Sequence, residues 1–177
     1  MVDTNFDITW IPLTYPDNQF IGVSHCPGKY SKNRGSSVKL YNDLKSLKKQ
    51  KVDVIISLTS EIEIESLGIA NFSDIVKNFG FIHFVEPIED FSVPKRDRKK
   101  NVNELINKIL TLIKNNKSIL VHCNLGLGRS GLIVALVIKF FGGFIDPISH
   151  VRKYRSGAVE TEEQKRFIAD FKLLNMD

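Results

Sequence analysis

The sequence predicts an α/β domain in which a central sheet of four to five strands is flanked by helices. Two observations indicate this class. Short runs rich in β-branched and aromatic residues alternate along the chain with longer segments of helical periodicity. The chain has 177 residues, of which 42% are hydrophobic, so it can bury one sizeable core, and no repeat or low-complexity linker divides it. We therefore expect a single domain over residues 8–174.

The composition of four segments is typical of strands, and the pattern of five others is typical of helices. The expected strands are residues 20–24, 52–58, 81–85 and 118–122. The expected helices are residues 36–49, 94–114 and 130–141, a short helix that starts at Asp146-Pro147, and a last one that Thr161 caps and that runs to residue 174.

Three of these helices have further signals. The first has an apolar stripe that consists of Val38, Tyr41, Leu44 and Leu47. The second has Pro94 as its first residue, a position that suits a side chain without an N–H. The third, residues 130–141, is apolar nearly all round and should be central and buried.

Composition and charge limit the possible classes of protein. Two cysteines, Cys26 and Cys123, form no metal-binding cluster with the four histidines, so neither a disulfide scaffold nor a metal centre is expected. The longest apolar run, residues 132–138, is too short for a membrane span of about 20 residues. The N-terminus has no leader pattern, and we expect a cytoplasmic protein. The net charge of +5 indicates attraction to anionic partners.

A short basic run carries most of this charge. Residues 95–100, Lys-Arg-Asp-Arg-Lys-Lys, hold five cations and one carboxylate, which gives +4. Such a run is usually a solvated face of a helix. The alternative is a positive rim that steers phosphorylated or acidic substrates to a nearby site.

The segment with the strongest chemical signal is His122-Cys-Asn-Leu-Gly-Leu-Gly-Arg-Ser130, which joins the last predicted strand to the apolar helix. Glycines within it allow the backbone to turn its N–H groups inward, and the start of the helix adds partial positive charge. This predicts a cradle for phosphate built from Asn124, Leu125, Gly126, Leu127, Gly128 and Arg129, in which the arginine can hold two oxygens.

A cysteine at the mouth of such a cradle is a candidate nucleophile. The positive field should lower the pKa of the Cys123 thiol below its usual value of about 8.5. The Ser130 hydroxyl could then stabilise the thiolate when it leaves phosphorus. The alternative interpretation is a buried cysteine before a glycine-rich turn, with Arg129 in a structural ion pair. His122 either orients the loop or is a core histidine that is satisfied by hydrogen bonds.

Phosphate-ester cleavage also needs an acid for the leaving oxygen. Asp90 lies in a proline-bounded loop, Pro87-Ile-Glu-Asp-Phe-Ser-Val-Pro94, which follows a predicted strand. Loops after strands are where α/β folds bind ligands, so this loop and the cysteine segment are expected to face one pocket. We take Asp90 as the acid, with Glu89 as its nearest rival. Both could instead be a solvated pair.

These residues resemble a known family. The segment from His122 to Ser130 is similar to the signature loop of cysteine-dependent dual-specificity protein phosphatases, and Asp90 falls where their acid loop would be. Together with Trp10-Ile-Pro-Leu, Gly22-Val-Ser-His-Cys-Pro-Gly28 and the segment from Val151 to Gln164, the chain most resembles the cyclin-dependent-kinase-associated phosphatase group. The resemblance covers about residues 10–171.

The resemblance implies a metal-independent phosphatase without cofactors that forms a cysteinyl-phosphate intermediate. It implies that Gln164 helps to place the hydrolytic water, although Thr161-Glu-Glu-Gln164 is also a capping box that would occupy this side chain. The implied partner is a phosphorylated protein, a kinase among the candidates, and neither a stable nucleic-acid partner nor a membrane is expected. The oligomeric state is not determined.

The chain departs from the family pattern in two places. Asn124 and Leu125 stand where smaller residues are more typical. Residues 31–35, Ser-Lys-Asn-Arg-Gly, resemble a phosphotyrosine-recognition loop that requires an aromatic residue at the position of Gly35. A shallow pocket that also accepts phosphoserine and phosphothreonine is therefore the better prediction.

Other functions use the same loop. RNA 5′-triphosphatases and phosphoinositide phosphatases are the alternatives among enzymes, although lipid-directed members tend to carry lysines in the loop and this one is uncharged from Asn124 to Gly128. A non-catalytic phosphoprotein-binding module is the alternative of another class. Such modules normally lack the nucleophile, whereas Cys123, Arg129 and Asp90 are all present.

Overall fold

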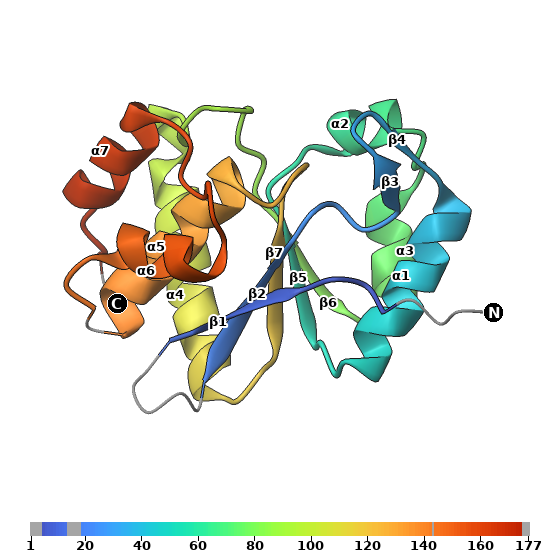
Figure 1. Ribbon diagram of the computed structural model, residues 1–177, viewed down its shortest axis with the longest axis horizontal. Coiled ribbons are helices and arrows are strands. Elements are labelled where there is room, and N and C mark those ends of the chain that lie inside the picture. The colour runs from blue at the N-terminus through green and yellow to red at the C-terminus, as the bar shows by residue number, and fades with distance from the viewer. Residues whose placement is uncertain (1–4, 14–18, 143, 175–177) are drawn as a thin grey trace.

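The computed structural model describes residues 5–13, 19–142 and 144–174, and it confirms the α/β class (Figure 1). A five-stranded sheet has the order β1-β2-β7-β5-β6, with β1 antiparallel to β2 and the other neighbours parallel. The strands are β1 (Thr9–Pro12), β2 (Phe20–Ser24), β5 (Val54–Ser57), β6 (Ile82–Val85) and β7 (Ile119–His122). All four predicted strands are confirmed. The sequence prediction lacked β1, because four residues that end in proline are too short for a recognisable pattern.

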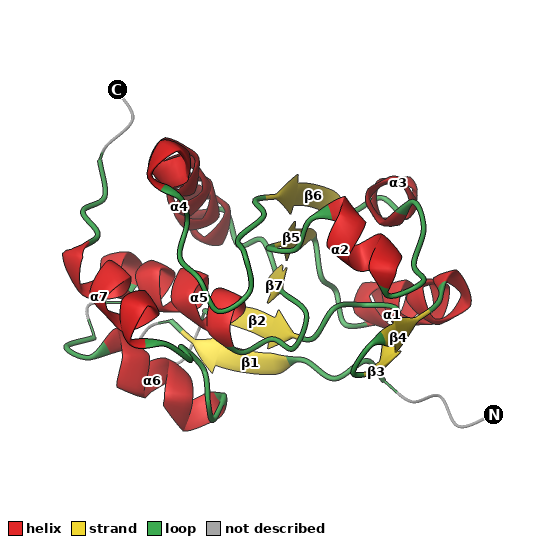
Figure 2. Cartoon of the chain, turned by 90° about the horizontal axis from the view of Figure 1, so that it is seen from above, coloured by secondary structure: helices red, strands yellow, loops and turns green. Residues whose placement is uncertain are grey.

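Helices cover both faces of the sheet (Figure 2). One face packs against α1 (Ser37–Lys49), α2 (Glu61–Ser66) and α3 (Phe72–Asn78), and the other against α4 (Lys99–Lys114), α5 (Gly128–Phe141), α6 (Pro147–Tyr154) and α7 (Glu162–Asp170). Because successive strand residues point to opposite faces, Val54 and Ile56 enter one core and Ile55 enters the other. None of the helices in the described part of the chain could cross a membrane.

The predicted apolar stripe of α1 is partly wrong. The helix forms as expected, with Ser36 as its capping residue, and Leu44 and Leu47 are buried. Val38 and Tyr41, however, are 74% and 47% exposed, and Leu40 takes their place in the core. Apolar residues at steps of three drift around a helix of 3.6 residues per turn, so only the i, i+4, i+7 set of Leu40, Leu44 and Leu47 shares one face.

Two helix boundaries also differ from prediction. Pro94 does not begin α4; it is buried in the preceding loop, and a 3₁₀ turn, η1 (Arg96–Arg98), leads into a helix that starts at Lys99. At the other end of the chain, α7 stops at Asp170. There the Lys139 ammonium binds the carbonyl oxygens of Ile168, Ala169 and Phe171, which satisfies the end of the helix well before residue 174.

The register of the sheet brings four loops together at one edge. Ser24 of β2 lies beside His122 of β7, which lies beside Ser57 of β5, which lies beside Val85 of β6. The segments that follow these residues therefore leave the sheet side by side. They include both chemistry-bearing segments, here named the cysteine loop (residues 123–129) and the Asp90 loop (residues 86–95).

Candidate active site

The cysteine loop folds tightly around Cys123, which is 3% exposed. It follows β7 directly, and its last two residues are the start of α5. Gly126 has a φ of 73°, and a Cβ there would lie 2.4 Å from the Ser24 carbonyl oxygen, so only glycine fits. This turn lets the Gly126 N–H donate to the Cys123 Sγ over 3.2 Å, a contact that favours a negatively charged sulfur.

Two carbonyl groups in the middle of the cysteine loop are bound by an arginine from outside the loop. Arg155, which follows α6, donates to the carbonyl oxygens of Leu125 and Gly126 over 3.0 and 3.1 Å. Among the described residues, the N–H groups of Leu125, Leu127 and Gly128 have no hydrogen-bond partner. These N–H groups and the amino end of α5 can together form an anion-binding nest.

Arg129 lies at the inner end of the loop and is 1% exposed. Its Nη1 and Nη2 donate to the two carboxylate oxygens of Glu63 in α2, over 2.7 and 2.9 Å, and Nη1 also donates to the Ile88 carbonyl oxygen. Its Nε is buried without a partner among the described residues. The Glu63 pair fixes the guanidinium and leaves the Nε–Nη2 edge, near which the Asp90 carboxylate lies, to bind two oxygens of an anion.

The sequence interpretation missed Glu63. The sequence around Glu63 does contain a local signal, because Ser60-x-x-Glu63 has the spacing of a capping box at a helix start. The Ser60 hydroxyl does accept from the Glu63 N–H, so the cap at the start of α2 exists. The glutamate carboxylate, however, binds Arg129, and only the register of β5 beside β7 brings these distant residues together.

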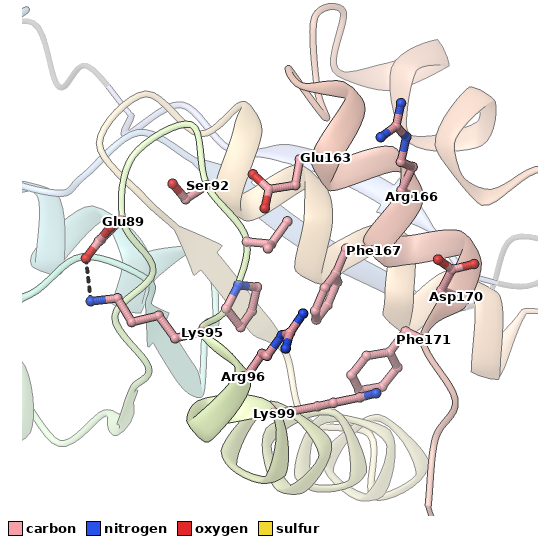
Figure 3. A pocket seen from close by; sticks show the side chains of 12 residues that line it. Glu89, Ser92, Lys95, Arg96, Lys99, Glu163, Arg166, Phe167, Asp170 and Phe171 are labelled. Carbon is pink, nitrogen blue, oxygen red and sulfur yellow. Dashed lines mark ion pairs between the residues drawn. The ribbon is translucent and has the colours of Figure 1, made fainter.

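The Asp90 loop places its two carboxylates differently. The Asp90 Oδ1 lies 3.2 Å from Arg129 Nη2, while half of its side chain is exposed. The Glu89 carboxylate points to the Lys95 ammonium at 2.7 Å, in an exposed ion pair (Figure 3). Of the two, Asp90 is therefore the carboxylate that contacts the cysteine-loop arginine.

Ser130 and Gln164 are both buried next to this loop. The Ser130 Oγ has no partner among the described residues, so its hydroxyl is available to a thiolate or an anion. Gln164 forms the capping box at the start of α7, and its Oε1 accepts from the N–H groups of Glu160 and Thr161. Its Nε2 donates to the Ser92 carbonyl oxygen over 3.1 Å, which ties α7 to the Asp90 loop.

A chain of hydrogen bonds lies under the cysteine loop. His122 Nδ1 contacts the Cys123 carbonyl oxygen, and its Nε2 lies 2.7 Å from the Ser57 Oγ, which lies 2.8 Å from His83 Nε2. A carbonyl only accepts, so Nδ1 of His122 carries the proton and Nε2 accepts from Ser57, while His83 donates to Ser57. Burial lowers the pKa of His122 to about 3 and that of His83 to about 4, so both are neutral.

The segment before the β3–β4 hairpin contacts the other side of the cysteine loop. The Cys26 N–H donates to the Asn124 carbonyl oxygen over 3.3 Å, a closeness that the sequence did not indicate. The hairpin itself, β3 (Lys29–Ser31) and β4 (Arg34–Gly35), contains the segment that resembles a phosphotyrosine-recognition loop. A Cβ at Gly35 would lie 2.6 Å from Ile69, so an aromatic side chain cannot occupy this position.

Comparisons with known proteins identify the family of this chain. A family model described as Cyclin-dependent kinase inhibitor 3 (CDKN3) matches residues 2–151. Cyclin-dependent kinase inhibitor 3 of Sus scrofa is 30% identical over 175 residues, and that of Homo sapiens is 28% identical over 174. Each alignment covers 96% of this chain and 80% of the relative.

Solved structures give the same result. A crystal structure of kinase-associated phosphatase, in which serine replaces the catalytic-site cysteine, has a TM-score of 0.83 at 27% identity over 93% of both chains. The active form of Tk-PTP has a TM-score of 0.69 at 23% identity over 92% of this chain and 95% of its own, a likeness of fold. The resemblance predicted from the sequence is confirmed: the chain belongs to the CDKN3, or kinase-associated phosphatase, family and has the fold of the cysteine-dependent tyrosine and dual-specificity phosphatases.

Proposed function

We propose that the protein is a dual-specificity protein phosphatase that hydrolyses phosphotyrosine, phosphoserine and phosphothreonine through a cysteinyl-phosphate intermediate. The observation that carries the proposal is the position of Asp90. Its carboxylate lies 3.2 Å from Arg129, the arginine of the loop that also holds Cys123, so nucleophile, oxyanion ligand and acid share one site.

In the first step, the Cys123 thiolate attacks phosphorus, a P–S bond forms, and the P–O bond to the substrate hydroxyl breaks. Asp90 gives its proton to the leaving oxygen. The inward N–H groups of the loop and the Nε–Nη2 edge of Arg129 hold the phosphoryl oxygens. Glu63 keeps the guanidinium in place through both steps.

In the second step, water attacks the cysteinyl phosphate, and Asp90 takes a proton from this water. The P–S bond breaks, and the buried Ser130 hydroxyl donates to the departing thiolate. Gln164 lies close enough to the loop that a Cβ at Gly128 would be 3.1 Å from its Nε2, which supports a role in placing the water. Its capping bonds occupy Oε1, so this role falls to the Nε2 group.

The preferred substrate is a phosphorylated protein. The cysteine loop has no charged side chain between Cys123 and Arg129, which favours phosphoproteins over phosphoinositides. The names of the relatives, cyclin-dependent kinase inhibitor 3 and kinase-associated phosphatase, support a phosphorylated kinase as the partner.

The decisive experiment compares hydrolysis rates on phosphotyrosine peptides, phosphothreonine peptides, triphosphorylated RNA and phosphoinositides. We expect both peptides to be the best substrates, with rates that a chelator leaves unchanged. Cys123→Ser should reduce turnover by about 10⁴-fold or more while phosphopeptide binding persists. Preferred hydrolysis of RNA or phosphoinositide would replace the proposal with that activity, and binding without turnover by the wild type would identify a phosphoprotein-binding module.

A further inference from the structure

Lys29 is a buried lysine that lies against the cysteine loop. It is the first residue of β3 and is 5% exposed. Its ammonium donates to the carbonyl oxygen of Asn124 over 3.1 Å and also to the Asn124 side-chain Oδ1. Among the described residues it forms no ion pair with a carboxylate.

The hydrogen bonds of this buried ammonium go to neutral oxygens, so its charge has no direct ion-pair partner among the described residues. Burial of a charge is costly unless an opposite charge is near, and hydrogen bonds to amide oxygens satisfy only its donors. Burial lowers the pKa of Lys29, and the groups that act in the opposite direction are Cys26, Cys123, Glu63 and Asp90. Three of these four groups, Cys123, Glu63 and Asp90, belong to the candidate site. The positive charge of Lys29 is therefore close enough to interact electrostatically with this site.

Asn124 is the residue that connects this charge to the loop. It directly follows the nucleophile and is one of the two loop positions at which the chain departs from the family pattern. Its carbonyl oxygen accepts from both Lys29 and the Cys26 N–H, and its side chain is bound by Lys29. The asparagine side chain, which is larger than the family's usual residue at this position, is therefore bound by a lysine from β3. The two side chains together fix the direction of the Asn124 carbonyl group.

We propose that Lys29 is a positioning residue for the phosphatase reaction, which through Asn124 fixes the first turn of the cysteine loop and places a buried positive charge behind the phosphoryl site. The inference rests on the proposed function. The Lys29 ammonium is bound to Asn124 rather than to a catalytic side chain. It acts on the loop that binds the phosphoryl oxygens, and it would strengthen binding of any tetrahedral oxyanion.

The test measures tungstate affinity by calorimetry and kcat/KM on p-nitrophenyl phosphate for Lys29→Met, Lys29→Arg and Asn124→Ala. We expect Lys29→Met to lower kcat/KM on the order of 10²-fold, because the loop is no longer fixed. Tungstate affinity should fall by about tenfold or more, because the loop that binds the oxyanion loses the charge-assisted hydrogen bonds from Lys29 to Asn124. Lys29→Arg should restore most of the tungstate affinity, since it keeps the charge and the donors.

Two further variants make the result specific. Lys45→Met removes the same charge from an exposed site on α1 and should change neither quantity. In the Asn124→Ala background, Lys29→Met should cost less than it does alone, because the two side chains act as a pair. Thermal unfolding of each variant separates loss of fold from loss of binding.

A folded Lys29→Met protein with wild-type tungstate affinity and kcat/KM would overturn the inference. If Lys29→Met does not fold, the Asn124→Ala variant replaces it as the test. Unchanged tungstate affinity in Asn124→Ala would then overturn the inference. The proposed function fails in a different way, namely if the wild type binds tungstate but hydrolyses no phosphate ester.

Discussion

The two loops that form the candidate site are built in opposite ways. The cysteine loop is buried, and residues from β2–β3, β7 and the end of α6 bind its carbonyl groups from outside. The tip of the Asp90 loop (residues 89–92) is exposed except for the half-buried Ser92. Two hydrogen bonds lie within it, from the Phe91 N–H to Asp90 Oδ1 and from the Ser92 N–H to the Glu89 carbonyl oxygen, and the side chains of Arg129 and Gln164 contact it from other elements. Phe91 has a φ of 57° and is 57% exposed.

This difference matches two different chemical tasks. An oxyanion site gains most from groups that are fixed before the reaction, since no energy is then spent on reorganising them. A carboxyl group that serves first a leaving oxygen and then a water must reach two positions, which a lightly held loop allows. Changes in the two loops should therefore affect different kinetic quantities.

After the loss of the nucleophile in Cys123→Ser, the largest effect is expected at Asp90. Asp90→Ala should slow turnover by about 10²–10⁴-fold, the range for a positioned acid. The matched control is Glu89→Ala, which removes the neighbouring carboxylate and its exposed ion pair with Lys95. Steady-state kinetics across pH will distinguish the two, and a larger loss in Glu89→Ala would assign the acid to Glu89.

Glu63 tests the fixed part of the site. Glu63→Gln removes the negative charge that pairs with the buried Arg129 guanidinium. Because the guanidinium is then less well positioned, kcat/KM should fall by up to about 10²-fold. Glu61→Gln, in the same helix but bound to Ser73, should leave kcat/KM near the wild-type value. Equal values for both variants would show that Arg129 does not depend on Glu63.

The histidines under the cysteine loop predict how folding stability depends on pH. His83 and His122 have folded pKa values of about 4 and about 3, below the value of 6.5 in the unfolded chain. The unfolded state therefore binds more protons below pH 6.5, and each histidine should remove about 1.4 kcal/mol of stability per pH unit as the pH falls from 6.5 toward 4.

Urea unfolding between pH 4 and 8 measures this slope, with His83→Gln as the test variant. Gln keeps a donor for Ser57 but does not titrate, so the slope should fall by the contribution of one histidine. A variant with the full wild-type slope would show that the His83 pKa is not lowered by folding.

The smallest effect is expected for the basic run beside the Asp90 loop. Lys95 and Arg98 are already paired with Glu89 and Glu86. Substitution of the exposed Arg96, Lys99 and Lys100 by Gln should lower kcat/KM for an acidic phosphopeptide a few-fold at low salt, about two- to tenfold, and less at high salt. A salt dependence identical to that of the wild type would exclude steering by this run.

The sequence was sufficient for the features that depend on local pattern. The cysteine loop between a buried strand and an apolar helix, the loop that carries Asp90, and the capping box at Gln164 all have short-range signals, and the structure places them as described. Their catalytic roles remain predictions. Glu63, Lys29 and the Ser57–His83 pair could not be found in this way, because their partners are 65 to 95 residues away or on a neighbouring strand.

Gln164 has a consequence for how motion of the Asp90 loop could be followed. One planar amide group connects the Ser92 carbonyl to the N–H groups of Glu160 and Thr161. If the Asp90 loop moves away, the Nε2 bond is lost and the amide is free to turn, so we expect the bonds that Oε1 accepts to weaken. Deuterium should then replace the amide hydrogens of Glu160 and Thr161 faster, which would report motion of the Asp90 loop without any substrate present.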